Sequence, residues 1–384
     1  MFRSFGDAHS QPVAIFASKG PTTGTNLARL VMKAVILLER AGAFVDALVC
    51  NGAATNLSMW KEYSVSGNLE NPINYFIHPL DDDRKVFVFA DAPHLIKCVR
   101  NHLHTQKILQ PAEYRIFWVH YDKLLIADTS NPGCLRVCPK LSSAHLNPTN
   151  TEKMWVKLAT QIFSRSVADG LQYYSKRGVF GLENIQGTVK FTMRFNDLFH
   201  ALNRRFPAQG IRRDSKDFEV LKSFLTWLDS WETQVAAGRI PKERFLTLST
   251  AEGHRVTVMS TIELTTYLLE VCDFKYVLTS RFNQDVLERF FEGLFAKPGL
   301  YNMLSFYSLV NPPKFGNCSI SNGCESCLLT LSDLTTSFRS NYEESKLETR
   351  KKRLDKSVDY EAECETVRES KTQCQKQRTV WCIT

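Results

Sequence analysis

The sequence predicts an α/β protein with a helix-covered sheet and a largely helical block. Three observations support this fold class. Apolar strand-like runs alternate with helical patterns over about the first 105 residues, a mainly helical block covers 151–231, and short helix and strand patterns return after about residue 260. Alternating strands and helices are typical of a sheet with helical cover.

The expected strands of the first part are short apolar runs, and each is followed by a helical pattern. Apolar residues recur at helical spacing over 27–38, and Gly42 is placed to end that helix. Asp91 follows the last apolar run and can cap the next helix, with Pro93 in its first turn. The expected strands are 13–17, Phe44–Cys50 and 85–90, and the expected helices are 27–38, 57–62 and the one that opens at 91–97.

The character of the chain changes after about residue 106. Short strand-like pieces at 115–119 and 124–127 lead into the helical block of 151–231. A basic loop within this block is interpreted either as a phosphate-binding surface or as an ordinary solvated loop. Its residues are Arg204, Arg205, Arg212, Arg213 and Lys216.

The third part is expected to contain a helix at 263–273, a short strand or approach segment at 275–278 and a helix at 283–291. The last helix places Asp285, Glu288 and Glu292 on one face. A row of carboxylates is usual on a surface helix and is less often catalytic. The tail after residue 341 mixes charges of both signs, which predicts a disordered segment or a frayed helix.

Bulk properties indicate an intracellular globular protein of two or three domains. The 384 residues are 43% hydrophobic and 23% charged, and the net charge of +8 suits a polyanionic partner without requiring one. Eleven cysteines without regular spacing favour reduced thiols, and one C-x-x-C at 324–327 is interpreted as plain thiols rather than zinc ligands. No signal peptide is evident, and the helix at 27–38 is too short to span a membrane.

Several stretches together resemble the P-element-type (THAP-family) DNA transposases. They are residues 51–60, 78–83, 86–101, 156–164 and 278–291, in the order and rough spacing of that family. The resemblance implies an RNase H-like mixed sheet flanked by helices and interrupted by a largely helical, GTP-binding insertion domain. It also implies DNA as a partner, a metal site for Mg²⁺ built from three carboxylates, and GTP as a second ligand.

Carried over to this chain, the resemblance leaves the metal site incomplete. The family's second acidic position matches Asn51, the third matches Glu288, and the first is expected on a strand upstream of this sequence. Asparagine is a poor ligand for a hard dication, so two-metal chemistry is not expected. Asp91 is interpreted as a helix cap rather than a substitute metal ligand. Without the upstream strand, the sheet is expected to have an unpaired edge.

For GTP, the resemblance points to five positions, which are Lys140, Val156, Ser164, Asn196 and Asp285. His200 stands where the family has another acidic residue. Each of the five also has an ordinary structural interpretation, as a solvated lysine, a core residue or a local helix partner.

The expected boundaries are 1–105 for the first part of the RNase H-like domain, 106–260 for the insertion, 261–335 for the resumed domain and 336–384 for the tail. Three functional hypotheses follow: a transposase-derived protein without catalysis, an active enzyme whose upstream exon is absent, and an interaction protein that associates with full-length transposase or with itself. The basic run Arg350–Arg353 suggests a nuclear protein.

Overall fold

A six-stranded mixed sheet forms the centre of one half of the molecule, with strand order β2-β1-β8-β3-β5-β4. The computed structural model describes residues 1–7, 9–14, 22–130, 136–295 and 378–383. Strand β3 is parallel to both β5 and β8, whereas β1, β2 and β4 are antiparallel to their neighbours. The strands of this sheet are β1 (Phe2–Ser4), β2 (Ser10–Gln11), β3 (Phe44–Cys50), β4 (Tyr75–His78), β5 (Asp81–Ala90) and β8 (Arg378–Ile383).

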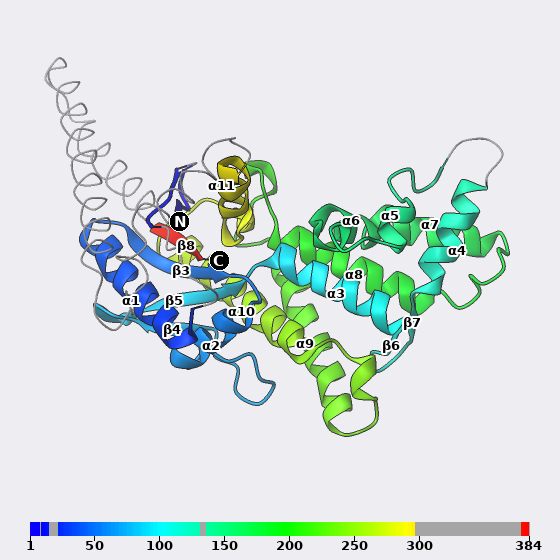
Figure 1. Cartoon of the computed structure of the whole chain (residues 1–384), viewed down its shortest axis with the longest axis horizontal. Helices are drawn as coiled ribbons and strands as arrows, with labels where there is room; N and C mark the ends of the chain where they lie inside the picture. The colour runs from blue at the N-terminus through cyan, green and yellow to red at the C-terminus, as the bar shows by residue number, and fades with distance from the viewer. Residues whose placement is uncertain (8, 15–21, 131–135, 296–377, 384) are drawn as a thin grey trace, which may run out of the picture.

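Strand β8, from the far end of the sequence, lies in the middle of this sheet (Figure 1). It pairs in parallel with β3 from Arg378 to Ile383 and antiparallel with β1. Met1 and Cys382 exchange two hydrogen bonds, of 3.0 and 2.8 Å. The expectation of a disordered tail or frayed helix is therefore wrong for these six residues. Strand β8 fills the position between β1 and β3, so neither of these two strands is open on that side. A six-residue apolar run inside a charged tail carries too little periodicity to predict its partner.

Helices cover both faces of the sheet because β3 buries side chains on both sides. Val45, Leu48 and Cys50 pack with α1 and α2, while Ala47 and Val49 pack with the end of α10 and with α11. Thr23 caps α1, accepting a bond from the backbone N–H of Asn26. The helices of the described chain are α1 (Gly24–Arg40), α2 (Ala54–Glu62), α3 (Ala92–Gln106), α4 (Val119–Thr129), α5 (Ser143–Leu146), α6 (Val156–Ile162), α7 (Arg165–Lys176), α8 (Gln186–Leu202), α9 (Asp217–Ala236), α10 (Leu248–Glu270) and α11 (Asp285–Phe295).

The insertion is the helical half of the molecule, with its own core of buried residues from α3 to α10 (Figure 1). Its centre is aromatic, and Phe195 contacts the rings of Phe191 and Phe224. A two-stranded sheet of β6 (Ile108–Leu109) and β7 (Ile116–Phe117) lies at its edge, which agrees in part with the strand expected at 115–119. Residues 124–127, expected as a strand, belong to α4, because so short an apolar run fits either periodicity.

Helix α10 belongs to both halves, and residue 260, the expected end of the insertion, lies inside it. Its hydroxyl side chains bond directly to strand β5. The hydroxyl of Thr257 donates to the carbonyl of Ala90 at 3.0 Å, and that of Ser260 donates to the carbonyl of Val88 at 2.6 Å. These bonds fix the insertion against the sheet.

Some expected features lie outside the described residues. These are most of the strand at 13–17, the C-x-x-C at 324–327 and the basic run at 350–353. Among the helices that the structure describes, none is long and apolar enough to span a membrane.

Candidate functional site

The candidate site lies where three parallel strands end. Asn51 follows β3, Asp91 follows β5, and Ile383 closes β8. The carboxyl ends of parallel strands meet at one edge of a sheet, which is where α/β proteins place their binding sites. The backbone N–H of Asp91 donates to the carbonyl of Cys50 at 2.9 Å, which holds the first two strand ends together.

The side chain of Asn51 is hydrogen-bonded to residues at the start of helix α2. Its side-chain oxygen accepts the backbone N–H of Ala53 at 3.0 Å and the side-chain amide of Asn56 at 2.7 Å. Asn56 is buried, so this pair is held firmly. The side-chain oxygen of Asn51 is therefore occupied by protein donors and carries no formal charge.

Asp91 caps helix α3, as predicted, and is fully buried. One carboxylate oxygen accepts the backbone N–H of His94 at 2.9 Å, and the other accepts that of Gln284 at 2.9 Å. Burial raises the pKa of Asp91 to about 7, opposed by these two bonds and reinforced by the charges of Glu288 and Asp285. At neutral pH this carboxyl group is therefore divided between its protonated and ionised forms.

Helix α11 closes the site from the other side. Gln284, just before the helix, bonds Asp91 through its backbone, and its side-chain amide donates to the carbonyl of Ile383. Glu288 is exposed one turn into the helix. Sequence reasoning missed Gln284 and Ile383, because only the placement of β8 brings them to the strand ends.

The residues present do not fit a two-metal centre. Such a centre needs several negative charges to hold two dications about 4 Å apart. Here Asn51 is neutral, both oxygens of Asp91 accept backbone donors, and Glu288 is the remaining carboxylate expected to bind metal. In the described part of the chain, no group of three or more His, Cys, Asp or Glu side chains is placed to hold a metal ion.

The five positions expected to bind GTP are distributed along the insertion and its junction with α11. Ser164 and Asn196 lie close together. The side-chain oxygen of Asn196 accepts the backbone N–H of Arg165, the residue after Ser164, at 3.2 Å. Val156 begins α6 and is half-buried, and Lys140 is an exposed loop residue.

Asp285 lies at the junction of the insertion with α11, and it pairs with Arg205 at 2.9 Å. The C-terminal end of α8 is tied to the same region. The backbone N–H of Arg204, just beyond that helix, donates to the hydroxyl of Thr279 at 2.9 Å. Asn196 and His200 lie one turn apart on α8. The five expected GTP positions therefore come from separate elements: a loop, the starts of α6 and α7, the middle of α8 and the start of α11.

The basic loop is only partly available for phosphates. Arg204 pairs with Asp217 at 2.6 Å, and Arg205 pairs with Asp285. Arg212 donates to the carbonyls of Gly210 and Pro207, at 3.2 and 3.0 Å, while Lys216 is exposed at the start of α9.

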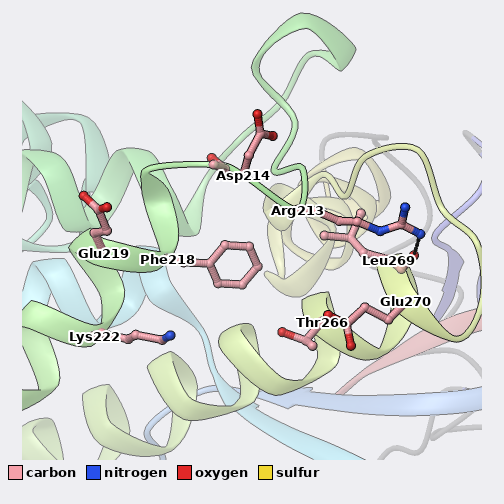
Figure 2. A pocket seen from close by; sticks show the side chains of 9 residues that line it. Arg213, Asp214, Phe218, Glu219, Lys222, Thr266, Leu269 and Glu270 are labelled. Atoms are coloured by element: carbon pink, nitrogen blue, oxygen red, sulfur yellow. Dashed lines mark hydrogen bonds between the residues drawn. The ribbon is translucent and has the colours of Figure 1, made fainter.

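Arg213 lines a cavity of about 430 Å³ between α9 and α10 (Figure 2). The guanidinium of Arg213 donates to the carbonyl of Leu269 at 2.8 Å. Phe218 lies near the middle of the labelled side chains, among groups of both charge signs. The other lining residues are Asp214, Ser215, Glu219, Lys222, Thr266 and Glu270. This cavity is built from elements away from the strand ends, and its mixed charge identifies no ligand.

Comparison with known proteins supports the RNase H-like fold. Residues 1–64 match a family model described as the TNP-like RNase H N-terminal domain, and residues 93–213 match the TNP-like GTP-binding insertion domain. The chain is 30% identical over 266 residues to the transposable element P transposase of Drosophila melanogaster, covering 69% of this chain and 34% of that protein. It is 25% identical over 279 residues to the human DNA transposase THAP9, covering 70% of this chain and 30% of that protein.

A solved structure, the Drosophila P element transposase strand transfer complex, matches with a TM-score of 0.65 at 28% identity. The match covers 77% of this chain and 64% of the solved chain. The chain spans about a third of the length of the curated relatives that it matches. Fold, family models and sequence agree: this chain is a homologue of P element transposase, with an RNase H-like domain and a GTP-binding-type insertion domain.

Proposed function

We propose that this chain is a transposase-derived protein that binds DNA and does not cut it by metal-dependent chemistry on its own. The observation that carries the proposal is Asn51, a neutral amide whose oxygen already accepts two hydrogen bonds at the strand end. The relationship to P element transposase supports DNA as the partner. The resemblance supports the assignment of this position to metal binding.

Electrostatics support the loss of metal binding. An Asp at position 51 would add a full negative charge beside Asp91, and Asn51 removes it. The two backbone donors on Asp91 and its raised pKa reduce the negative charge available at neutral pH. Glu288 is then the main ionised group for a dication, and a single exposed carboxylate binds Mg²⁺ weakly.

The test is a nicking and strand-transfer assay with the purified chain, DNA duplexes and Mg²⁺ or Mn²⁺. We expect salt-dependent DNA binding without metal-dependent cleavage. Calorimetry with Mg²⁺ should detect no tight site in the wild type, and Asn51→Asp should strengthen metal binding. Metal-dependent nicking that disappears in Glu288→Gln but persists in Glu292→Gln would contradict the proposal. The same outcome would favour the active-enzyme hypothesis.

A second candidate function is guanine nucleotide binding by the insertion, favoured by the match of residues 93–213. A carboxylate at Asp285 can accept from the N1–H and amino group of guanine, once it exchanges its pairing with Arg205. Calorimetric titration with GTP and ATP tests this. We expect Asp285→Asn to weaken GTP binding about tenfold and to leave ATP binding unchanged, with Glu292→Gln as the matched control on the same helix. Equal GTP affinity in all three proteins would exclude the role of Asp285.

Association with full-length transposase and location in the nucleus remain predictions. Co-purification of the chain with such a transposase, without DNA cleavage by the chain, would support the first. Imaging of the tagged chain with and without Arg350–Arg353 tests the second.

A further inference from the structure

A second cavity, of about 380 Å³, lies between the β1–β2 edge of the sheet and α11. It is lined by residues of β1, β2, the short helix Thr279–Phe282 and α11. Three of its six lining residues are arginines, and none is acidic. The lining residues are Arg3, Ser10, Arg281, Val286, Arg289 and Phe290.

Among the described residues, the hydrogen-bond partners of the three arginine side chains are backbone carbonyl groups. Arg3 donates to the carbonyl of Ser280 at 2.9 Å, and Arg281 donates to the carbonyls of Ser4, at 3.0 Å, and Asp7. Arg289 donates to a backbone carbonyl one turn earlier on α11 at 3.1 Å. Such bonds orient the side chains without neutralising them. Within the described ranges of the chain, no carboxylate forms an ion pair with any of the three.

Two carboxylates act on this cluster from a distance. Burial lowers the pKa of Arg3 and of Arg281; Asp285 opposes this lowering at Arg3, and Asp7 opposes it at Arg281. Asp285 is already paired with Arg205, and burial, helped by the charges of Arg281 and Arg289, still lowers the pKa of Arg3 to about 10. The cluster therefore has excess positive charge that an anion would relieve.

We propose that this cavity binds a phosphate group of a DNA strand. Guanidinium groups with fixed orientation match the oxygens of a phosphate, and Val286 with Phe290 offers an apolar wall for a sugar or an unpaired base. Arg289 and Glu288 are consecutive residues of α11, so the cavity and the candidate site share one turn of this helix. This inference rests on the proposed function, because it names the contact through which that site would meet DNA.

Arg289→Gln is the sharpest variant, because Arg289 is exposed and its structural bond is local to one helix. Arg239→Gln is the matched control, since Arg239 is exposed in the insertion and bonded only to a nearby side chain. Binding of a fluorescein-labelled 20-nucleotide single strand and of the matching duplex would be followed by anisotropy at several salt concentrations. We expect Arg289→Gln to weaken binding several-fold whatever the sequence, and to reduce the slope of log affinity against log salt by about 0.7–0.9. Arg289→Lys should recover part of both.

Three outcomes separate this inference from the proposed function. If wild type and Arg289→Gln bind DNA with the same affinity and slope, the cavity does not hold a DNA phosphate, although the proposed function stands. If the wild type does not bind DNA but inorganic phosphate protects the protein thermally, and Arg289→Gln removes that protection, the site takes free phosphate and the DNA proposal fails. If neither DNA nor phosphate binds, both are overturned. Arg3→Gln, with folding checked by circular dichroism, provides a second variant in the same cavity.

Discussion

The central place of β8 gives a stability prediction that depends on tertiary structure alone. Val380 is fully buried between β1 and β3, although only four residues follow it in the sequence. Val380→Ala removes two methyl groups from the core. The lost transfer free energy is about 1.6 kcal/mol and the cavity adds to it, so we expect about 2–3 kcal/mol of destabilisation.

Urea unfolding followed by circular dichroism measures this effect. At a slope of about 2 kcal/mol per M, the midpoint should fall by about 1 M. Val271→Ala is the matched control, because Val271 is 69% exposed and its truncation should change stability by no more than about 0.5 kcal/mol. Equal midpoints for wild type and Val380→Ala would refute the placement of β8 in the sheet.

Deleting residues 378–384 extends the same test. The deletion leaves β1 and β3 without a shared neighbour and removes the ion pair of Arg378 with the buried Asp46, at 2.7 Å. Burial already raises the pKa of Asp46 to about 6, so this carboxylate depends on its cationic partners. We expect fast amide hydrogen exchange in β3 and loss of soluble protein. A deletion variant with wild-type exchange in β3 would show that the sheet does not need this strand.

Three further predictions concern single buried positions. Burial raises the folded-state pKa of Asp91 to about 7, so the folded state binds this proton more tightly than the unfolded state. The free energy of unfolding of the wild type should therefore fall by up to a few kcal/mol as pH rises from about 4 to about 7. Asp91→Asn should lack this fall when urea unfolding is measured at both pH values. Burial lowers the folded-state pKa of His254 to about 3, so the stability contributed by the neutral ring is complete above about pH 6.5 and is lost as pH falls. The stability of His254→Phe should therefore decrease less on acidification than that of the wild type. Equal decreases in the two proteins would contradict this. Gly187→Ala should destabilise by about 2 kcal/mol or more in thermal unfolding, because an added Cβ would overlap the backbone carbonyl of Arg115, and an unchanged melting temperature would show that the two segments can separate freely.

Local patterns in the sequence were sufficient to predict several parts of the structure. The helical spacing over 27–38 lies within α1, the apolar run Phe44–Cys50 is β3 as predicted, and Asp91 caps α3. These features depend on neighbours in the chain, through hydrogen bonds and periodicity that a few residues determine.

Only part of the candidate site could be predicted from the sequence. The resemblance indicated Asn51 and Glu288, but not that the amide oxygen of Asn51 is occupied by helix α2 or that Gln284 joins Asp91 to β8. Likewise, the sequence alone does not show that Arg204 pairs with Asp217 at the start of α9, or that Arg205 pairs with Asp285, 80 residues away. Such pairings depend on contacts across tens to hundreds of residues, which composition and periodicity do not encode.

The sequence by itself determined α1, strand β3, the cap of α3 and the neutral residue at the end of β3, because these follow from the order of side chains along the chain. Tertiary structure alone decided that the last strand occupies the middle of the sheet, and that three arginines from separate elements share one cavity. The physical reason is that strand pairing and charge clustering are satisfied by whichever segments meet in space. Their free energy comes from burial and hydrogen bonding between residues that are far apart in the sequence.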